Sequence, residues 1–161
     1  MLFRSQAALR QRDQTGEGAH IDMALLDTQV SVLANQAMNF LVSGKAPRRL
    51  GNAHPNIVPY QVFPVADGHV VIAVGNDGQF KRLCQILDVP TLADDPLYAT
   101  NPARVKNRTV LCDRLADLTA TLLRADLLSA LEKAGVPAGP INTVGDVFAD
   151  AQVKARHESG S

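Results

Sequence analysis

The chain has 161 residues, a formal net charge of zero and hydrophobic residues at 46% of its positions. This length predicts one main folded domain with an apolar core, and the balanced charge argues against nucleic acid or a membrane surface as a partner. The apolar runs are too short to span a bilayer and the two cysteines suggest buried free thiols in a reducing compartment, so we expect a cytoplasmic protein.

The first 44 residues predict a helix end, a short strand and a second helix. Residues 1–12 have the pattern of a helix end, and His20–Leu25 is typical of a short strand. Asp27 is expected to cap a helix over Thr28–Val42, which Gly44 ends. The strand has no partner nearby in the sequence. Its edge and the apolar helix face therefore predict a homodimer or higher oligomer, with domain swapping as one route.

A polar loop follows over Lys45–Asn56 and is interpreted as a binding loop. The residues proposed to bind a ligand in and next to it are Arg49, Asn52, His54 and Tyr60. His54 has the chemistry of an acid–base residue. Because the sequence places no carboxylate or nucleophile beside it, we favour a hydrogen-bonded structural histidine.

A β-hairpin is predicted next, with strands at Gln61–Pro64 and His69–Val74. The connecting Val65–Gly68 ends in Asp-Gly, a strong hairpin signal. Pro64 cannot donate to a sheet ladder, so the first strand is expected to lie at an edge or to end there.

The segment Gly75–Gly78 predicts a turn that opens a helix, with Asp77 as the N-cap. A strand, a glycine turn and a helix N-terminus can together bind an anion through backbone N–H groups. The glycine spacing matches neither G-x-G-x-x-G nor a P-loop, so a simple turn with a cap is the favoured interpretation.

The remaining residues predict helices and one more strand. Asn101 is expected to cap a helix that runs to about Leu123, with Val110 and Leu111 facing inward and Arg108 outward. Helices are also expected over 125–134, from a Thr143 cap to 148, and over 150–156, before a disordered tail at 157–161. An extended segment over 136–142 is expected to pair with the hairpin. The fold class is therefore α+β, with a small three-stranded antiparallel sheet packed with helices, and no metal-ligand cluster.

Several motifs, in the same order, resemble family III CoA-transferases, the group that includes formyl-CoA:oxalate and carnitine CoA-transferases. The motifs are Arg10–Gly18, His20–Asp27, Arg49–Asn52, His54–Tyr60, Gly75–Phe80, Asn101 with Arg104–Arg108, and Gly135–Ile141. The resemblance implies a Rossmann-like large domain and a small domain. Residues 1–44 would be a strand–helix remnant of the large domain and residues 45–156 the small domain.

The resemblance also implies a function. Full-length members move CoA from an acyl-CoA to a carboxylic acid, with the CoA thioester as substrate and no permanently bound cofactor. A glycine turn shields the substrate in such enzymes, and Gly75, Asn76, Asp77 and Gly78 match that turn.

The resemblance places the nucleophilic aspartate upstream of Arg12, and none of Asp13, Asp22 or Asp27 matches it. We therefore expect no catalytic residue in this chain, no transfer by the chain alone, and a missing large-domain chain as one partner. Two alternatives stay open: a fragment related to the α-methylacyl-CoA racemases of the same fold, and a stand-alone module that self-associates.

Overall fold

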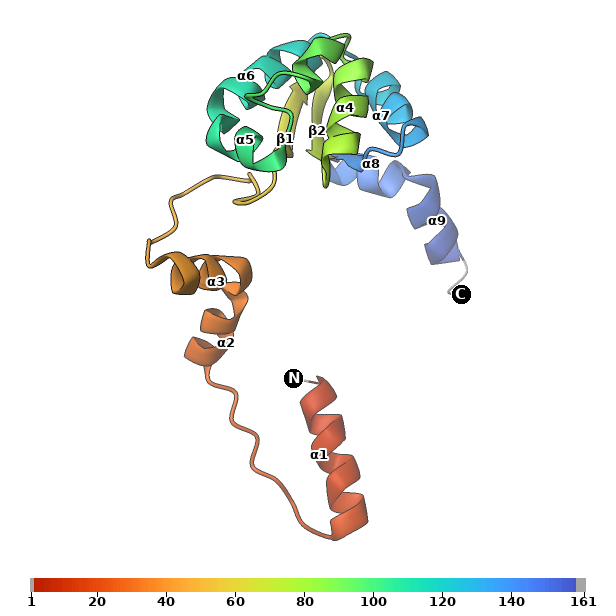
Figure 1. Ribbon diagram of the computed structural model, residues 1–161. Coiled ribbons are helices and arrows are strands. Elements are labelled where there is room, and N and C mark those ends of the chain that lie inside the picture. The colour runs from red at the N-terminus through yellow and green to blue at the C-terminus, as the bar shows by residue number, and fades with distance from the viewer. Residues whose placement is uncertain (1, 159–161) are drawn as a thin grey trace. The chain divides into compact units, whose positions relative to one another are not determined.

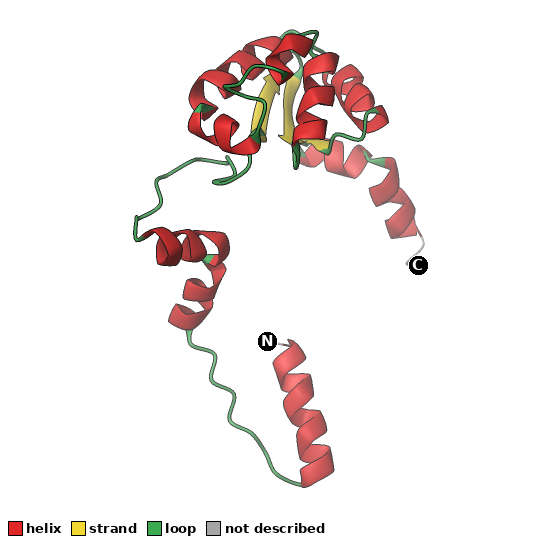
Figure 2. Ribbon diagram, viewed as in Figure 1, coloured by secondary structure: helices red, strands yellow, loops and turns green. Residues whose placement is uncertain are grey.

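The computed structural model describes residues 2–158, which form one compact unit ending at Arg48 and a second beginning at Arg49. The first unit holds the helices α1 Leu2–Thr15, α2 Leu25–Val32 and α3 Ala34–Ser43 (Figure 1). The second holds the sheet and the other helices (Figure 2). No helix within residues 2–158 is both long and apolar enough to cross a membrane.

The predicted strand at His20–Leu25 is wrong. Residues 17–24 have no regular secondary structure, and α2 begins at Leu25 with a bond from the Thr28 N–H to the Ala24 carbonyl (3.2 Å). A strand needs a neighbour to satisfy its backbone groups, and the described part of this unit contains no second strand. The strand of a Rossmann-like remnant is therefore not present in this structure.

The predicted helix over Thr28–Val42 is two helices. Ala34 has a left-handed φ of 43°, which separates α2 from α3. Asp27 does not cap the helix, because it lies in the first turn of α2, while the extended Ala24 is the N-cap. The predicted stop is confirmed: Gly44, at φ 67°, donates its N–H to the Phe40 carbonyl (2.7 Å).

The sheet of the second unit is three-stranded, antiparallel and ordered β1-β2-β3, as predicted. The strands are β1 Tyr60–Val65, β2 Gly68–Ala73 and β3 Ala138–Pro140. Ala66 and Asp67 connect β1 and β2, so the predicted hairpin is confirmed, and Pro64 lies on the edge strand β1.

Helices cover one face of this sheet. The helices of this unit are α4 Asp77–Ile86, the 3-10 turn η1 Pro90–Ala93, α5 Asn101–Lys106, α6 Arg108–Thr119, α7 Arg124–Lys133, α8 Val144–Ala149 and α9 Ala151–Glu158. Helix α6 packs against β1 and α7 against β2, with α4 beside α7 (Figure 1). The buried face of the sheet carries Phe63 on β1 opposite Val70 on β2. Along each strand, the positions next to these residues are more exposed.

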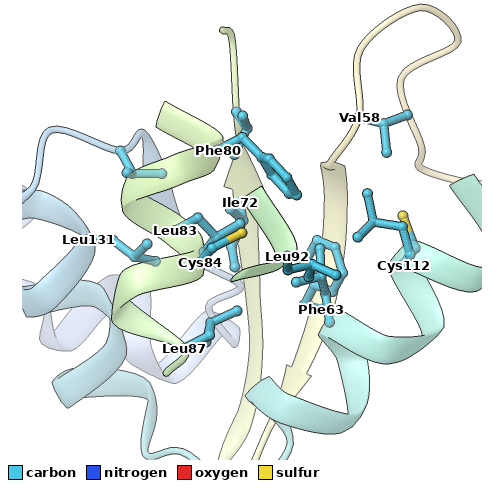
Figure 3. Close-up of a cluster of buried hydrophobic side chains, with 14 of the residues drawn as sticks. Val58, Phe63, Ile72, Phe80, Leu83, Cys84, Leu87, Leu92, Cys112 and Leu131 are labelled. Atoms are coloured by element: carbon cyan, nitrogen blue, oxygen red, sulfur yellow. The ribbon is translucent and has the colours of Figure 1, made fainter. Parts of the chain in front are cut away.

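The core lies between this sheet face and the helices. Phe63 and Ile72 from the strands meet Leu83 from α4 and Leu131 from α7 (Figure 3). Each of these side chains is almost fully buried, so the unit that contains the candidate site has its own apolar core.

The predicted helix from Asn101 to Leu123 is also two helices, which meet at Asn107. Asn107 leaves helical geometry (φ −105°, ψ 22°), and its side-chain amide donates to the Leu97 carbonyl (3.0 Å). The break changes which positions of α6 face inward. Leu111 is fully buried as predicted, but Val110 is 65% exposed, so its predicted inward position is wrong.

The C-terminal predictions are largely confirmed. Thr143 caps α8 in a capping box, accepting from the Asp146 N–H (3.2 Å) and donating its own N–H to the Asp146 carboxylate (2.9 Å). The Thr143 N–H and the Thr143 hydroxyl both donate to the Asp146 carboxylate, and these two hydrogen bonds lower the pKa of Asp146. Helix α9 extends to Glu158, so residues 157–158 of the predicted tail are helical, and residues 159–161 lie outside the described residues.

Cys84 and Cys112 are buried free thiols, as predicted, and burial raises the pKa of each from 9.0 to about 11. As the pH rises, the two thiols ionise in the unfolded chain before they ionise in the folded protein. We therefore expect the contribution of the two thiols to stability to be complete below pH 9.0 and to be lost progressively as the pH rises towards 11. Urea unfolding at pH 7 and pH 10 measures this loss, and C84A/C112A should lose less between the two pH values. An equal loss in both proteins would assign the effect to other groups.

Candidate functional site

The hairpin brings the predicted binding loop and the glycine turn to one end of the sheet. The loop leads into β1 and the turn follows β2, and Tyr60 at the start of β1 pairs with Ala73 at the end of β2. The Val74 N–H then donates to the Pro59 carbonyl (2.9 Å). The loop at Tyr60 and the turn at Gly75 are 15 residues apart in the sequence, and they therefore meet at the same end of the sheet.

His54 and Tyr60 contact each other within and next to the binding loop. Their rings stack with 5.2 Å between centroids and 7° between planes. The His54 N–H donates to the Tyr60 carbonyl (2.9 Å), and Nδ1 of His54 accepts from the Asn56 N–H (3.1 Å). His54 is thus a hydrogen-bonded histidine that shapes the loop, and its neutral form carries the proton on Nε2.

Asn52 holds the second half of the loop to β1. Its Oδ1 accepts from the Val62 N–H (3.0 Å), across ten residues of sequence. Arg49 is exposed at the beginning of the loop. The structure therefore gathers Asn52, His54 and Tyr60 at the N-terminal end of β1, with Arg49 three residues before Asn52.

The predicted cap of α4 is wrong by one residue. Asn76, not Asp77, is the N-cap: it is extended, and its Oδ1 accepts from the Gln79 N–H (2.9 Å). Asp77 is the first residue of α4, and its Oδ1 accepts from Nη2 of Arg104 (2.8 Å). The carboxylate neutralises a buried cation, a role that the local sequence does not reveal.

Backbone N–H groups in and just after the glycine turn donate to side chains of the same short segment. The Gly75 N–H donates to Oε1 of Gln79 (2.6 Å), so the N–H groups of Gly75 and Gln79 already have partners. A Cβ at Gly75 would lie 3.3 Å from Gln79 Oε1, and one at Gly78 would lie 3.3 Å from Asn76 Oδ1. The glycines permit this close approach. The turn with a cap is therefore better supported than a general anion site.

Arg104 is the residue of this region that the sequence did not indicate. It is fully buried, and its guanidinium lies 4.5 Å above the centre of the Phe80 ring. Nε donates to the Val58 carbonyl (2.7 Å), and Nη1 donates to the carbonyls of Tyr98 (2.9 Å) and Ala99 (3.3 Å). One side chain thus joins the loop before β1, the segment before α5 and the start of α4.

Asn101 and Arg108 hold the same loop from either side of Arg104. Asn101 was predicted to cap the helix, but Thr100 is the N-cap; the Asn101 side chain instead accepts from the Val58 N–H (3.1 Å). It also donates to the carbonyl of residue 56 (2.8 Å). Arg108, predicted to face outward, is partly buried and donates to the carbonyls of His54 (3.1 Å) and Pro55 (2.6 Å).

The sequence carries one signal that could have found these contacts. Asn101, Arg104 and Arg108 are spaced by three and four residues, which would place these polar side chains on one face of the continuous helix that the sequence predicts. Among residues 3–156, whose side chains are described, no group of three metal-binding side chains occurs. The site offers a loop and a turn that are held in place by side-chain hydrogen bonds.

Comparison with known proteins gives a consistent result. The sequence model of CoA-transferase family III matches residues 2–159. A succinate–glutarate CoA-transferase of Agrobacterium fabrum is 57% identical over 151 residues, and a human succinyl-CoA:glutarate CoA-transferase is 44% identical over 147 residues. These alignments cover 94% and 91% of this chain, but only 38% and 34% of those proteins.

Solved structures agree. The crystal structure of a CaiB/BaiF family protein from Brucella suis is 60% identical, with a TM-score of 0.74, and the match covers 94% of this chain and 40% of that one. A Mycobacterium tuberculosis protein, 24% identical with a TM-score of 0.78, shares the fold over 96% of this chain and 40% of that one. This chain thus spans about two-fifths of the length of the proteins that it matches.

Proposed function

The chain belongs to CoA-transferase family III, and on that premise we propose that residues 45–156 form the small domain of an enzyme that moves CoA from an acyl-CoA to a carboxylic acid. Residues 1–44 would belong to its large domain. The observation that carries the proposal is the 57% identity to a succinate–glutarate CoA-transferase over nearly the whole chain.

The names of the relatives favour dicarboxylic substrates. Both the Agrobacterium and the human relative are named for succinate or succinyl-CoA and glutarate. We propose succinyl-CoA as the donor and glutarate as the acceptor of the complete enzyme. These names also favour CoA transfer over the α-methylacyl-CoA racemase alternative.

The role proposed for this chain is to shield and contact the substrate. The glycine turn Gly75–Gly78 would cover the thioester, and the loop with Arg49, Asn52, His54 and Tyr60 would contact the substrate. Transfer through a covalent intermediate needs a carboxylate free to attack the thioester. Asp77, the carboxylate of the turn, has one oxygen bound to Arg104. The nucleophile is therefore proposed to lie outside these residues.

We expect the 161-residue chain alone to transfer no CoA from succinyl-CoA to glutarate. The measurement is the rate of glutaryl-CoA formation, with circular dichroism to show that the chain is folded. Clear turnover by the chain alone would contradict the proposed location of the nucleophile.

A chimera tests the proposed reaction directly. Residues 2–158 of this chain replace the aligned segment of the Agrobacterium enzyme, which supplies the remainder. The chimera is expected to form glutaryl-CoA from succinyl-CoA at a rate within about tenfold of the parent enzyme, because most contacts of the segment are retained. A folded chimera without transfer would contradict the proposed function.

Self-association is a second proposal, supported by the first unit. Its helices α2 and α3 leave large apolar side chains more than half exposed: Leu25, Leu26, Val30, Val32, Leu33, Met38, Leu41 and Val42. Such a surface in water favours association with a second copy or with a large-domain chain. The argument from an unpaired strand edge no longer applies, because residues 17–24 are not a strand.

We expect sedimentation equilibrium at micromolar concentration to give a dimer mass or larger. Met38→Glu should shift the mass towards the monomer, because a charge in an apolar contact is unfavourable. Val110→Glu, a similar change at an exposed position of the second unit, is the control. A monomer for the unchanged chain would contradict self-association.

A further inference from the structure

The contacts of Arg104 reach further than those of its neighbours. Asn101 and Arg108 bind only the loop before β1, through the carbonyl and amide groups of residues 54–58. Arg104 binds this loop at Val58 and also binds Asp77 in the glycine turn. It is therefore the side chain that ties the two segments of the candidate site to each other.

The charges explain why Arg104 binds Asp77. The Arg104 side chain has no exposed surface, and its other partners are neutral carbonyl groups. Among residues 3–156, whose side chains the structure describes, Asp77 is the one carboxylate within ion-pair distance of it. A buried cation without a countercharge is unfavourable, so the turn is held at the position where Asp77 reaches Arg104.

Asp77 is not needed to start the helix. Asn76 already caps α4 through its bond to the Gln79 N–H. The Asp77 side chain is 55% exposed, so its removal leaves no cavity in the core. The contact with Arg104 therefore fixes the placement of the turn, in addition to the bond that fixes its local shape.

We propose that Arg104 is a positioning residue, which holds the glycine turn Gly75–Gly78 against the loop of His54 and Tyr60 by binding Asp77 and Val58 at once. Its importance for the reaction rests on the proposed function. The tether itself does not, because it follows from contacts within the described residues.

Hydrogen exchange in the 161-residue chain tests the tether. Asp77→Ala is expected to raise amide exchange over residues 75–80 about tenfold, the effect of losing one charge-assisted hydrogen bond. Asp77→Asn keeps an oxygen acceptor and should raise it less. The urea midpoint should fall only slightly, because Arg104 keeps its three carbonyl partners and the Asp77 carboxylate is half exposed to water.

The matched control is Asp126→Ala, which removes an exposed carboxylate from the first turn of α7. It should leave exchange over residues 75–80 unchanged, since Arg104 is not involved. Unchanged exchange in Asp77→Ala, or an equal rise throughout residues 49–158, would overturn the tether.

The same variants in the chimera test the positioning role. Asp77→Ala should lower kcat about ten- to hundredfold, with a smaller change in KM, because the turn no longer holds its place over the reacting group. An inactive unmodified chimera would refute the proposed function and leave the exchange result standing. A rise in exchange with an unchanged kcat would overturn the positioning role.

Discussion

Arg104→Ala is expected to lower the free energy of unfolding of the second unit by about 3–5 kcal/mol. The change removes the partners of the Val58 and Tyr98 carbonyls, and an unsatisfied buried polar group costs about 1–3 kcal/mol. It also leaves a cavity against the face of the Phe80 ring on which the guanidinium packs. The loss of the Asp77 ion pair adds little, because that carboxylate is exposed enough to be hydrated.

Two further variants separate these contributions. Arg104→Met restores most of the volume without any donor, and Arg104→Lys restores the charge with a single ammonium group that cannot reach all the carbonyls. Both should be less destabilised than Arg104→Ala. Arg114→Ala, at an exposed arginine of α6, should change the free energy by no more than about 0.5 kcal/mol.

Urea unfolding followed by tyrosine fluorescence measures this free energy. The chain has no tryptophan, and its two tyrosines, Tyr60 and Tyr98, both lie in the second unit. A loss below about 1 kcal/mol for Arg104→Ala, the range of an exposed ion pair, would contradict the structural role of Arg104.

Leu111→Ala is expected to cost about 2–5 kcal/mol, while Val110→Ala changes stability by less than about 0.5 kcal/mol. These neighbours on α6 differ only in which way they face: Leu111 is fully buried and Val110 is 65% exposed. Alanine also favours the helix more than valine does, so Val110→Ala can be slightly stabilising.

The pair decides between the sequence prediction and the structure. A continuous helix from Asn101 placed both side chains inward, whereas the break at Asn107 turns Val110 to solvent. Similar losses for the two variants in the same urea experiment would contradict the break and support the continuous helix.

The parts of the fold that short stretches of sequence determine were predicted correctly. The Asp-Gly signal placed the hairpin, Gly44 ended a helix, and Thr143 with Asp146 started one. In each case a few neighbouring residues have one favourable backbone geometry, whatever the rest of the chain does. The hairpin also determined that the loop before β1 and the turn after β2 share one end of the sheet.

Only the tertiary structure decided how the polar side chains are used. Asp77 and Asn101 are both good helix caps by residue type, yet each lies one residue inside its helix and contacts a distant segment. The buried guanidinium of Arg104 needs a carboxylate as its countercharge. The backbone N–H and carbonyl groups of residues 56–58 need a side chain that both accepts and donates a hydrogen bond. Both requirements arise because α4 and α5 pack against the same loop. The resulting tertiary contacts outweigh the local preference of Asp77 and Asn101 for the N-cap position. The strand expected at His20–Leu25 failed for a related reason: a strand depends on a partner, and residues 2–48 supply none.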